Sequence, residues 1–229
     1  MANVFQYRGK TIWMTLDEVA NPQHTALIVV DMQTDFCAPE GVFAQNGIDI
    51  SMYPSMISRL DKLMGQARRV GVPVIYLLMT QLKGGEADSP AQIRFNMRLH
   101  QGTRLQPGPL EYTQDGSAGQ AVISALTPQS GDLVVKKYRS SGFWGTNLDM
   151  ILRSMNRKTV VVTGCTTEGC VESTARDALF ADYYVVVPED GVASDDQAQH
   201  EASLLLMRHR FDMTTCEELV NTWEVARHG

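Results

Sequence analysis

The sequence predicts an α/β protein, a three-layer α/β/α sandwich built on a six-stranded, mostly parallel sheet. Short tracts of β-branched residues alternate with amphipathic stretches along the chain. The tracts are apolar at successive positions, as in strands that helices cover on both faces. The 229 residues suffice for one large core, and no linker divides them. We therefore expect a single domain over residues 1–229, with residues 1–24 as an N-terminal lead.

Six tracts have the length and composition of buried strands. Each carries several aliphatic or aromatic residues in succession, and most are bounded by polar residues, Gly or Pro. These predicted strands are residues 25–31, 72–79, 132–137, 159–164, 183–189 and 212–216.

The stretches between the strands carry apolar residues at helical spacing. Right-handed crossovers would place these helices on both faces of the sheet. Residues 80–114 interrupt the alternation with a polar, Gly- and Pro-punctuated stretch that is typical of a lid or an interface element. The predicted helices are residues 54–69, 91–99, 117–126, 147–155, 170–181, 197–208 and 217–227.

Composition and charge exclude several classes of protein. A net charge of −6 with scattered basic residues argues against a nucleic-acid surface. No tract approaches the roughly 20 apolar residues of a membrane helix, and the first residues lack the features of a signal peptide. We therefore expect a cytoplasmic protein without a disulfide scaffold, because the chain has only four irregularly spaced cysteines, Cys37, Cys165, Cys170 and Cys216.

Three residues with chemically active side chains follow predicted strands. In open parallel sheets ligands bind outside the carboxyl ends of the strands, where these residues would meet. Asp31 closes the first strand, Lys137 closes the third, and Cys170 opens the helix after the fourth. Each residue alone is compatible with a loop, surface or core role. Together they predict an activated thiolate, because a helix N-terminus and a neighbouring ammonium lower the pKa of a thiol.

Cys165 and Cys170, five residues apart, could instead form a metal site or a disulfide. A metal site lacks two further ligands, since no C-x-x-C or H-x-x-x-H segment completes it. A disulfide would cross a tight turn in a chain that otherwise looks cytoplasmic. We expect neither, and we expect no metal and no other cofactor.

Three segments resemble the signature blocks of the isochorismatase-like cysteine hydrolases. They are "LIVVDMQTDFC" (residues 27–37), "KYRSSGFWGTNLDMILR" (137–153) and "VVTGCTTEGCVESTARDA" (161–178), and they occur in the family's order. The resemblance spans most of the chain, and the combination of blocks is more specific than any one of them. It implies the three-layer sandwich that the strand and helix pattern also predicts.

The resemblance also implies roles for individual residues. The family's catalytic triad falls on Asp31, Lys137 and Cys170. The family has a cis peptide bond in the turn before the nucleophile, which here would join Cys165 to Thr166. The N–H groups of Thr166 and Cys170 would then face a developing oxyanion.

Because the chain has Cys170, the resemblance favours hydrolysis of a small amide or ureide, with release of ammonia, over cleavage of a vinyl ether. The chain most resembles ureidoacrylate and biuret amidohydrolases, and then N-carbamoylsarcosine amidase, which implies hydrolysis through a covalent intermediate on Cys170. The alternatives are an amidase of the maleamate or nicotinamide type and a non-catalytic binding member of the fold. A nicotinamidase metal centre is disfavoured, because no His precedes His100 in the segment after the second strand. The resemblance further implies a homodimer or homotetramer.

Substrate-binding residues are less visible in the sequence. Phe36, Phe143 and Trp144 could wall a pocket, although aromatic residues near strand ends are also common in cores. An arginine could pair with a substrate carboxylate, since its guanidinium suits bidentate recognition. If none reaches the pocket, an uncharged ureide such as biuret is favoured over a ureido acid. The candidate arginines are Arg94, Arg98, Arg104 and Arg139.

Overall fold

A parallel sheet of seven strands forms the centre of the computed structural model, which describes residues 4–99, 108 and 110–226. The strand order is β5-β4-β3-β6-β7-β9, and β8 pairs with β6. All six predicted strands are present, and the seventh, β8, was missed because two residues carry no periodic signal. The strands are β3 (Thr25–Val30), β4 (Val74–Met79), β5 (Leu133–Lys137), β6 (Thr159–Cys165), β7 (Tyr184–Pro188), β8 (Val192–Ala193) and β9 (Asp212–Thr214).

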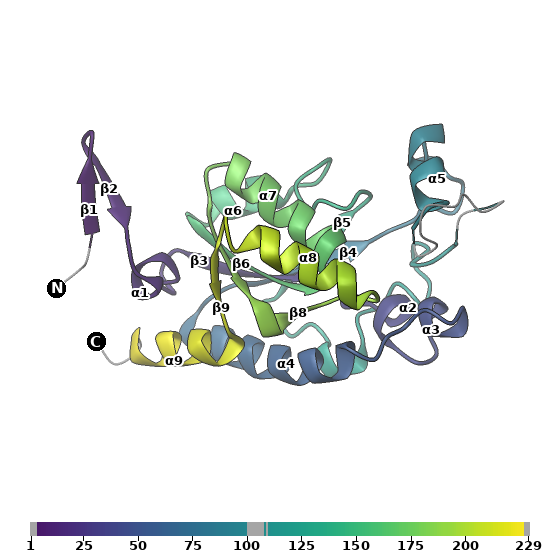
Figure 1. Cartoon of the computed structure of the whole chain (residues 1–229), viewed down its shortest axis with the longest axis horizontal. Helices are drawn as coiled ribbons and strands as arrows, with labels where there is room; N and C mark the ends of the chain where they lie inside the picture. The colour runs from purple at the N-terminus through teal and green to yellow at the C-terminus, as the bar shows by residue number, and fades with distance from the viewer. Residues whose placement is uncertain (1–3, 100–107, 109, 227–229) are drawn as a thin grey trace.

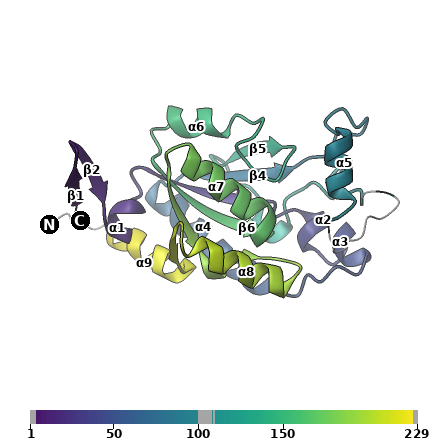
Figure 2. The ribbon, with the colours of Figure 1, turned by 45° about the horizontal axis from the view of Figure 1, so that its top comes forward.

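Helices cover both faces of the sheet, which confirms the predicted three-layer sandwich (Figures 1 and 2). Side chains alternate across a strand, so β3 directs Leu27 and Val29 into one core and Ile28 and Val30 into the other. The first core is closed by α4 (Tyr53–Val70) and α9 (Cys216–Ala226), and the second by α6 (Leu148–Ser154), α7 (Glu172–Phe180) and α8 (Gln197–Met207).

The predicted helix at residues 117–126 is wrong. Only its end is helical, as the 3-10 turn η1 (Ser124–Leu126). The preceding carbonyls accept hydrogen bonds from another segment, since Thr34 N–H donates to Ala121 O and Asp35 N–H donates to Gly119 O. These partners lie in α2 (Thr34–Cys37), so a tertiary contact replaces the helical hydrogen bonds.

Other short elements also escaped prediction because one helical turn is too short to show a period. They are α1 (Leu16–Val19), α2 and α3 (Val42–Gln45). The helix predicted inside residues 80–114 is present as α5 (Pro90–Asn96), next to α2 and α3 at one end of the molecule in both ribbon views.

The N-terminal lead folds as a two-stranded antiparallel hairpin that projects from the other end of the body (Figure 1). Its strands are β1 (Val4–Tyr7) and β2 (Lys10–Trp13). Phe5 and Tyr7 on β1 are exposed. Within the described part of the chain, no helix combines the length and apolar character that crossing a bilayer requires.

Candidate active site

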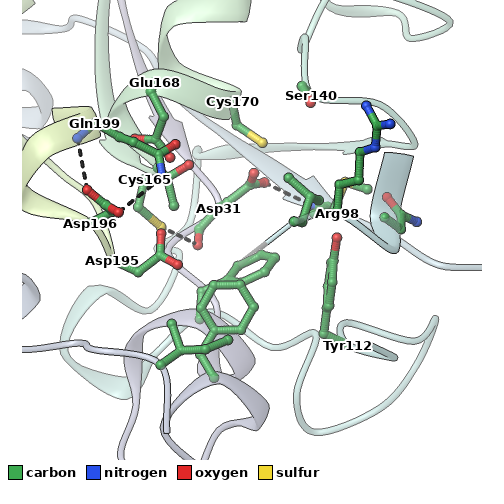
Figure 3. A pocket seen from close by; sticks show the side chains of 18 of the residues that line it. Asp31, Arg98, Tyr112, Ser140, Cys165, Glu168, Cys170, Asp195, Asp196 and Gln199 are labelled. Carbon is green, nitrogen blue, oxygen red and sulfur yellow. Dashed lines mark hydrogen bonds between the residues drawn. The ribbon is translucent and has the colours of Figure 1, made fainter. Parts of the chain in front are cut away.

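Asp31, Lys137 and Cys170 meet at the carboxyl ends of the strands. Lys137 Nζ lies 2.7 Å from Asp31 Oδ2 and 3.1 Å from Cys170 Sγ. The ammonium therefore lies in contact with both the carboxylate and the thiol. Figure 3 shows the Asp31 and Cys170 side chains directed into the same cavity.

The backbone around Asp31 directs its carboxylate toward the end of β4. Asp31 has a φ of 52°, in the left-handed region that non-glycine residues rarely adopt. Its Oδ1 accepts a hydrogen bond of 2.9 Å from Met79 N–H. Gln33 Oε1 accepts from the same N–H, and Gln33 Nε2 donates to Met79 O. These bonds fix the carboxylate, so the unusual backbone conformation serves to hold an acceptor at the sheet edge.

Lys137 is fully buried at the end of β5. Burial opposes its charge, but the Asp31 carboxylate and the Cys170 thiol together raise the pKa of Lys137 above its ordinary value. Lys137 Nζ also donates to Arg139 O at 3.2 Å. These acceptors therefore favour the charged ammonium form of Lys137.

Cys170 lies in a π-helical turn, η2 (Thr167–Val171), that precedes α7. The predicted helix start at Cys170 is therefore wrong: the helical segment begins three residues earlier, and Val171 N–H donates to Thr166 O. The predicted activated thiolate is also corrected. Burial, with the Asp31 charge, raises the pKa of Cys170 to about 12, and the opposing effect of Lys137 is smaller. This pKa favours the protonated thiol over the thiolate at neutral pH.

The turn before η2 contains a cis peptide bond between Cys165 and Thr166. Gly164, just before it, has a φ of 105°, and a Cβ there would lie 2.1 Å from Val30 O. Only glycine fits so close to the neighbouring strand. The glycine thus lets β6 and β3 deliver Cys165 and Asp31 to the same place.

Cys165 contacts Cys37 rather than forming a bond with Cys170. The two Sγ atoms lie 3.8 Å apart, and Cys165 Sγ donates to Asp31 O at 3.3 Å. The contact with Cys37, and then burial, raise the pKa of Cys165 well above its ordinary value. All four cysteines are free thiols. Among the described residues, no three His, Cys, Asp or Glu side chains are grouped so that they could hold a metal ion.

A cavity of about 880 Å³ opens above these groups. Phe36 lines it and packs against Phe43 and Tyr112, with ring centroids 4.8 and 5.2 Å away. The wall also contains Thr166 and Glu168 beside Cys170. Tyr112 and Glu168 were not singled out from the sequence, although Glu168 lies inside the third signature block.

Two of the predicted pocket residues are placed elsewhere, and the prediction is corrected for both. Phe143 packs against Tyr183 beside the second core, with ring centroids 5.9 Å apart. Trp144 is 71% exposed and borders an adjoining, more open groove instead of the cavity itself. Both residues lie between β5 and α6, whereas the cavity wall is built from α2, α3, α5, η2 and α8.

The candidate arginines are also separated by the structure. Arg98 lines the cavity (Figure 3). Arg94 is exposed outside it, and Arg139 borders the more open groove and donates to the carbonyls of Tyr138 and Ala87. Arg104, like His100, lies outside the described residues.

Comparison with known proteins supports the family predicted from the three sequence blocks. The family model of the isochorismatase domain matches residues 25–218. Ureidoacrylate amidohydrolase RutB of Methylobacterium radiotolerans is 34% identical over 189 residues, which cover 80% of this chain and 73% of that protein. The protein of the same name from Enterobacter sp. is 36% identical over 180 residues, covering 74% and 75%.

Solved structures show the same fold. A cysteine hydrolase from Pseudomonas syringae pv. phaseolicola has a TM-score of 0.77 and 30% identity, covering 90% of this chain and 95% of that one. N-carbamoylsarcosine amidase from Thermoplasma acidophilum has a TM-score of 0.65 and 29% identity, covering 84% and 96%. With the domain match and the identities above, these likenesses establish that the chain belongs to the isochorismatase family of hydrolases.

Proposed function

We propose that the chain hydrolyses the terminal C–N bond of a small ureido acid of the ureidoacrylate type, through a covalent intermediate on Cys170. This proposal rests on the contact of the buried Lys137 ammonium with both Asp31 and Cys170. The contact brings together a proton acceptor, a positive charge and a nucleophile. The names of two curated relatives, both ureidoacrylate amidohydrolases, support the substrate class.

In the first step Cys170 Sγ attacks the carbonyl carbon of the substrate as Asp31 accepts the thiol proton. The carbonyl electrons move to oxygen, where the N–H groups of Thr166 and Cys170 would stabilise the negative charge. Burial and the Asp31 charge raise the pKa of Cys170 to about 12, so the thiol would pass its proton to an acceptor as it attacks. The Lys137 ammonium stabilises the forming thiolate.

In the second step the C–N bond breaks and Asp31 returns its proton to the departing nitrogen, so that ammonia leaves and a thiocarbamate remains on Cys170. Water then attacks the thiocarbamate carbonyl while Asp31 accepts its proton. The C–S bond breaks, the thiol is restored, and the carbamate product decomposes to carbon dioxide and an amine.

A ureido acid is favoured over an uncharged ureide because an arginine reaches the cavity. Arg98 is the cationic side chain that lines the cavity in the described part of the chain. Its guanidinium can pair with a substrate carboxylate in a bidentate manner. Arg98→Gln should therefore raise KM for ureidoacrylate and leave KM for biuret little changed.

Ammonia release tests the proposal when it is measured on ureidoacrylate, biuret, N-carbamoyl amino acids, maleamate and nicotinamide. Ureidoacrylate should give the highest kcat/KM. Cys170→Ser should keep the melting temperature and substrate binding while it abolishes turnover. A Cys170→Ser rate close to that of the parent would refute the covalent mechanism, and no release from any compound would favour a binding protein.

Two further expectations belong to this proposal. The four free cysteines suit a reducing cytoplasm. The projecting hairpin, with Phe5 53% and Tyr7 51% exposed, is a candidate contact for a homodimer or homotetramer. Light scattering on the intact chain and on a Phe5→Ser/Tyr7→Ser variant would show whether these side chains hold copies together.

A further inference from the structure

Glu168 is an acidic side chain in the wall of the cavity, two residues before Cys170 in η2. Its Oε2 is buried and has no hydrogen-bond partner in the described part of the chain. Figure 3 places Glu168 and Arg98 on opposite sides of Asp31 and Cys170. Glu168 therefore lines the cavity on the side opposite the cationic side chain, and one of its two carboxylate oxygens is covered.

Nearby carboxylates have donors that account for their positions. Asp196 accepts from Gln199 N–H and caps α8. Glu172, two residues after Cys170, accepts from Ser203 and pairs with Arg176. Glu168 Oε2 has no such donor among the described residues.

An unsatisfied buried acceptor costs stability, and more so when it is charged. Such a group calls for a physical explanation, and a place in a ligand cavity provides one, because the missing donors can come from the ligand. Glu168 would then accept N–H groups that only the bound substrate supplies.

We propose that Glu168 determines specificity by accepting the N–H groups of a ureide, an inference that rests on the proposed function. A ureido acid carries N–H donors on both sides of its carbonyl carbon and a carboxylate at its far end. With the carbonyl at Cys170, the donors would face Glu168 and the carboxylate would face Arg98. Analogues without N–H groups leave Glu168 unpaired, and a buried acceptor of this kind rejects them strongly.

Binding measured in the Cys170→Ser background tests this role without requiring turnover. The probes are 3-ureidopropionate and its fully N-methylated counterpart, which keeps the carbonyl and the carboxylate but lacks N–H. Calorimetric titration should show that Glu168→Gln weakens binding of 3-ureidopropionate about tenfold or more. The same change should reduce the ratio of the dissociation constants of the methylated probe and 3-ureidopropionate. The steric effect of the methyl groups cancels in this comparison, because it is the same in every variant.

Two control variants distinguish a direct contact with the ligand from a general effect of charge and from a loss of stability. Glu201→Gln removes an exposed carboxylate of α8 and should change the dissociation constant less than about twofold. Glu172→Gln removes an acceptor with two partners and should lower the melting temperature. Glu168→Gln should melt at or above the temperature of its parent, because it removes an unsatisfied charge.

Several outcomes would overturn the inference. They are no binding of 3-ureidopropionate to the Cys170→Ser parent, an unchanged preference in Glu168→Gln, and equal weakening of both probes together with a lower melting temperature. The proposed function fails separately. If the unmodified chain releases no ammonia but its binding depends on Glu168, hydrolysis is refuted and recognition stands. If the unmodified chain hydrolyses ureides and Glu168→Gln distinguishes the two probes as well as its parent does, only the role of Glu168 is refuted.

Discussion

Replacing Lys137 by Met breaks a buried ion pair without leaving a large void. Lys137 and Asp31 have side chains that are 0% and 2% exposed, so solvent does not screen the pair. Removal of one partner of such a pair leaves an uncompensated buried charge and costs about 3–5 kcal/mol. For a chain of this length that corresponds to a fall in melting temperature of about 6 to 20 °C.

The neighbouring residue provides a matched control. Lys136 also pairs with an aspartate, Asp115, but the two side chains are 47% and 35% exposed. A pair of this kind contributes about 0–1 kcal/mol, so Lys136→Met should melt close to the parent. The contrast between adjacent lysines separates the effect of burial from that of losing one positive charge.

The free energy of unfolding of both variants is measured by urea unfolding and thermal melting at neutral pH. The same measurements on Asp31→Asn and on the double variant complete a double-mutant cycle. The double variant Asp31→Asn/Lys137→Met should recover part of the stability, because neither group is then left charged, with a coupling of about 1–3 kcal/mol. All variants at Asp31 or Lys137 should lose turnover. The reasoning is refuted if Lys137→Met loses no more stability than Lys136→Met, or if the two single changes are additive.

Because burial keeps Cys170 protonated, its alkylation by iodoacetamide, followed by mass spectrometry, should be slow at neutral pH and rise about tenfold per pH unit toward its pKa of about 12. Fast alkylation that does not vary with pH would contradict this. The folded-state pKa of Cys170 is raised, so its contribution to stability is complete below the unfolded pKa of about 8.5 and is lost as pH rises toward 12. Cys170→Ser should therefore show a shallower alkaline fall in melting temperature than the parent. Gly164→Ala, which places a Cβ against Val30 O, should cost about 3 kcal/mol or more. Gly65→Ala, inside α4 with no atom within 4 Å, should stabilise by about 0.5–1 kcal/mol. Equal melting temperatures for the two alanine variants would refute this account of Gly164.

Periodicity identified the fold because strands buried on both faces and helices of several turns repeat their local signal. The strands of residues 25–31 and 159–164 were found within one residue of their observed ends. Residues 117–126 were predicted wrongly because Thr34 and Asp35 supply their backbone carbonyls with donors from elsewhere in the chain. No local pattern reports such a partner.

That three chemically active side chains would meet at one edge of the sheet could be predicted from the sequence, since Asp31 and Lys137 close predicted strands and Cys170 follows one. The protonation of these groups and the contacts around them could be described only from the folded chain. Burial raises the pKa of the Cys170 thiol, the Lys137 ammonium lies in contact with both partners, and one oxygen of Glu168 has no donor among the described residues. The reason is physical: pKa values and hydrogen-bond satisfaction depend on desolvation and on contacts between distant segments, and these exist only in the folded chain.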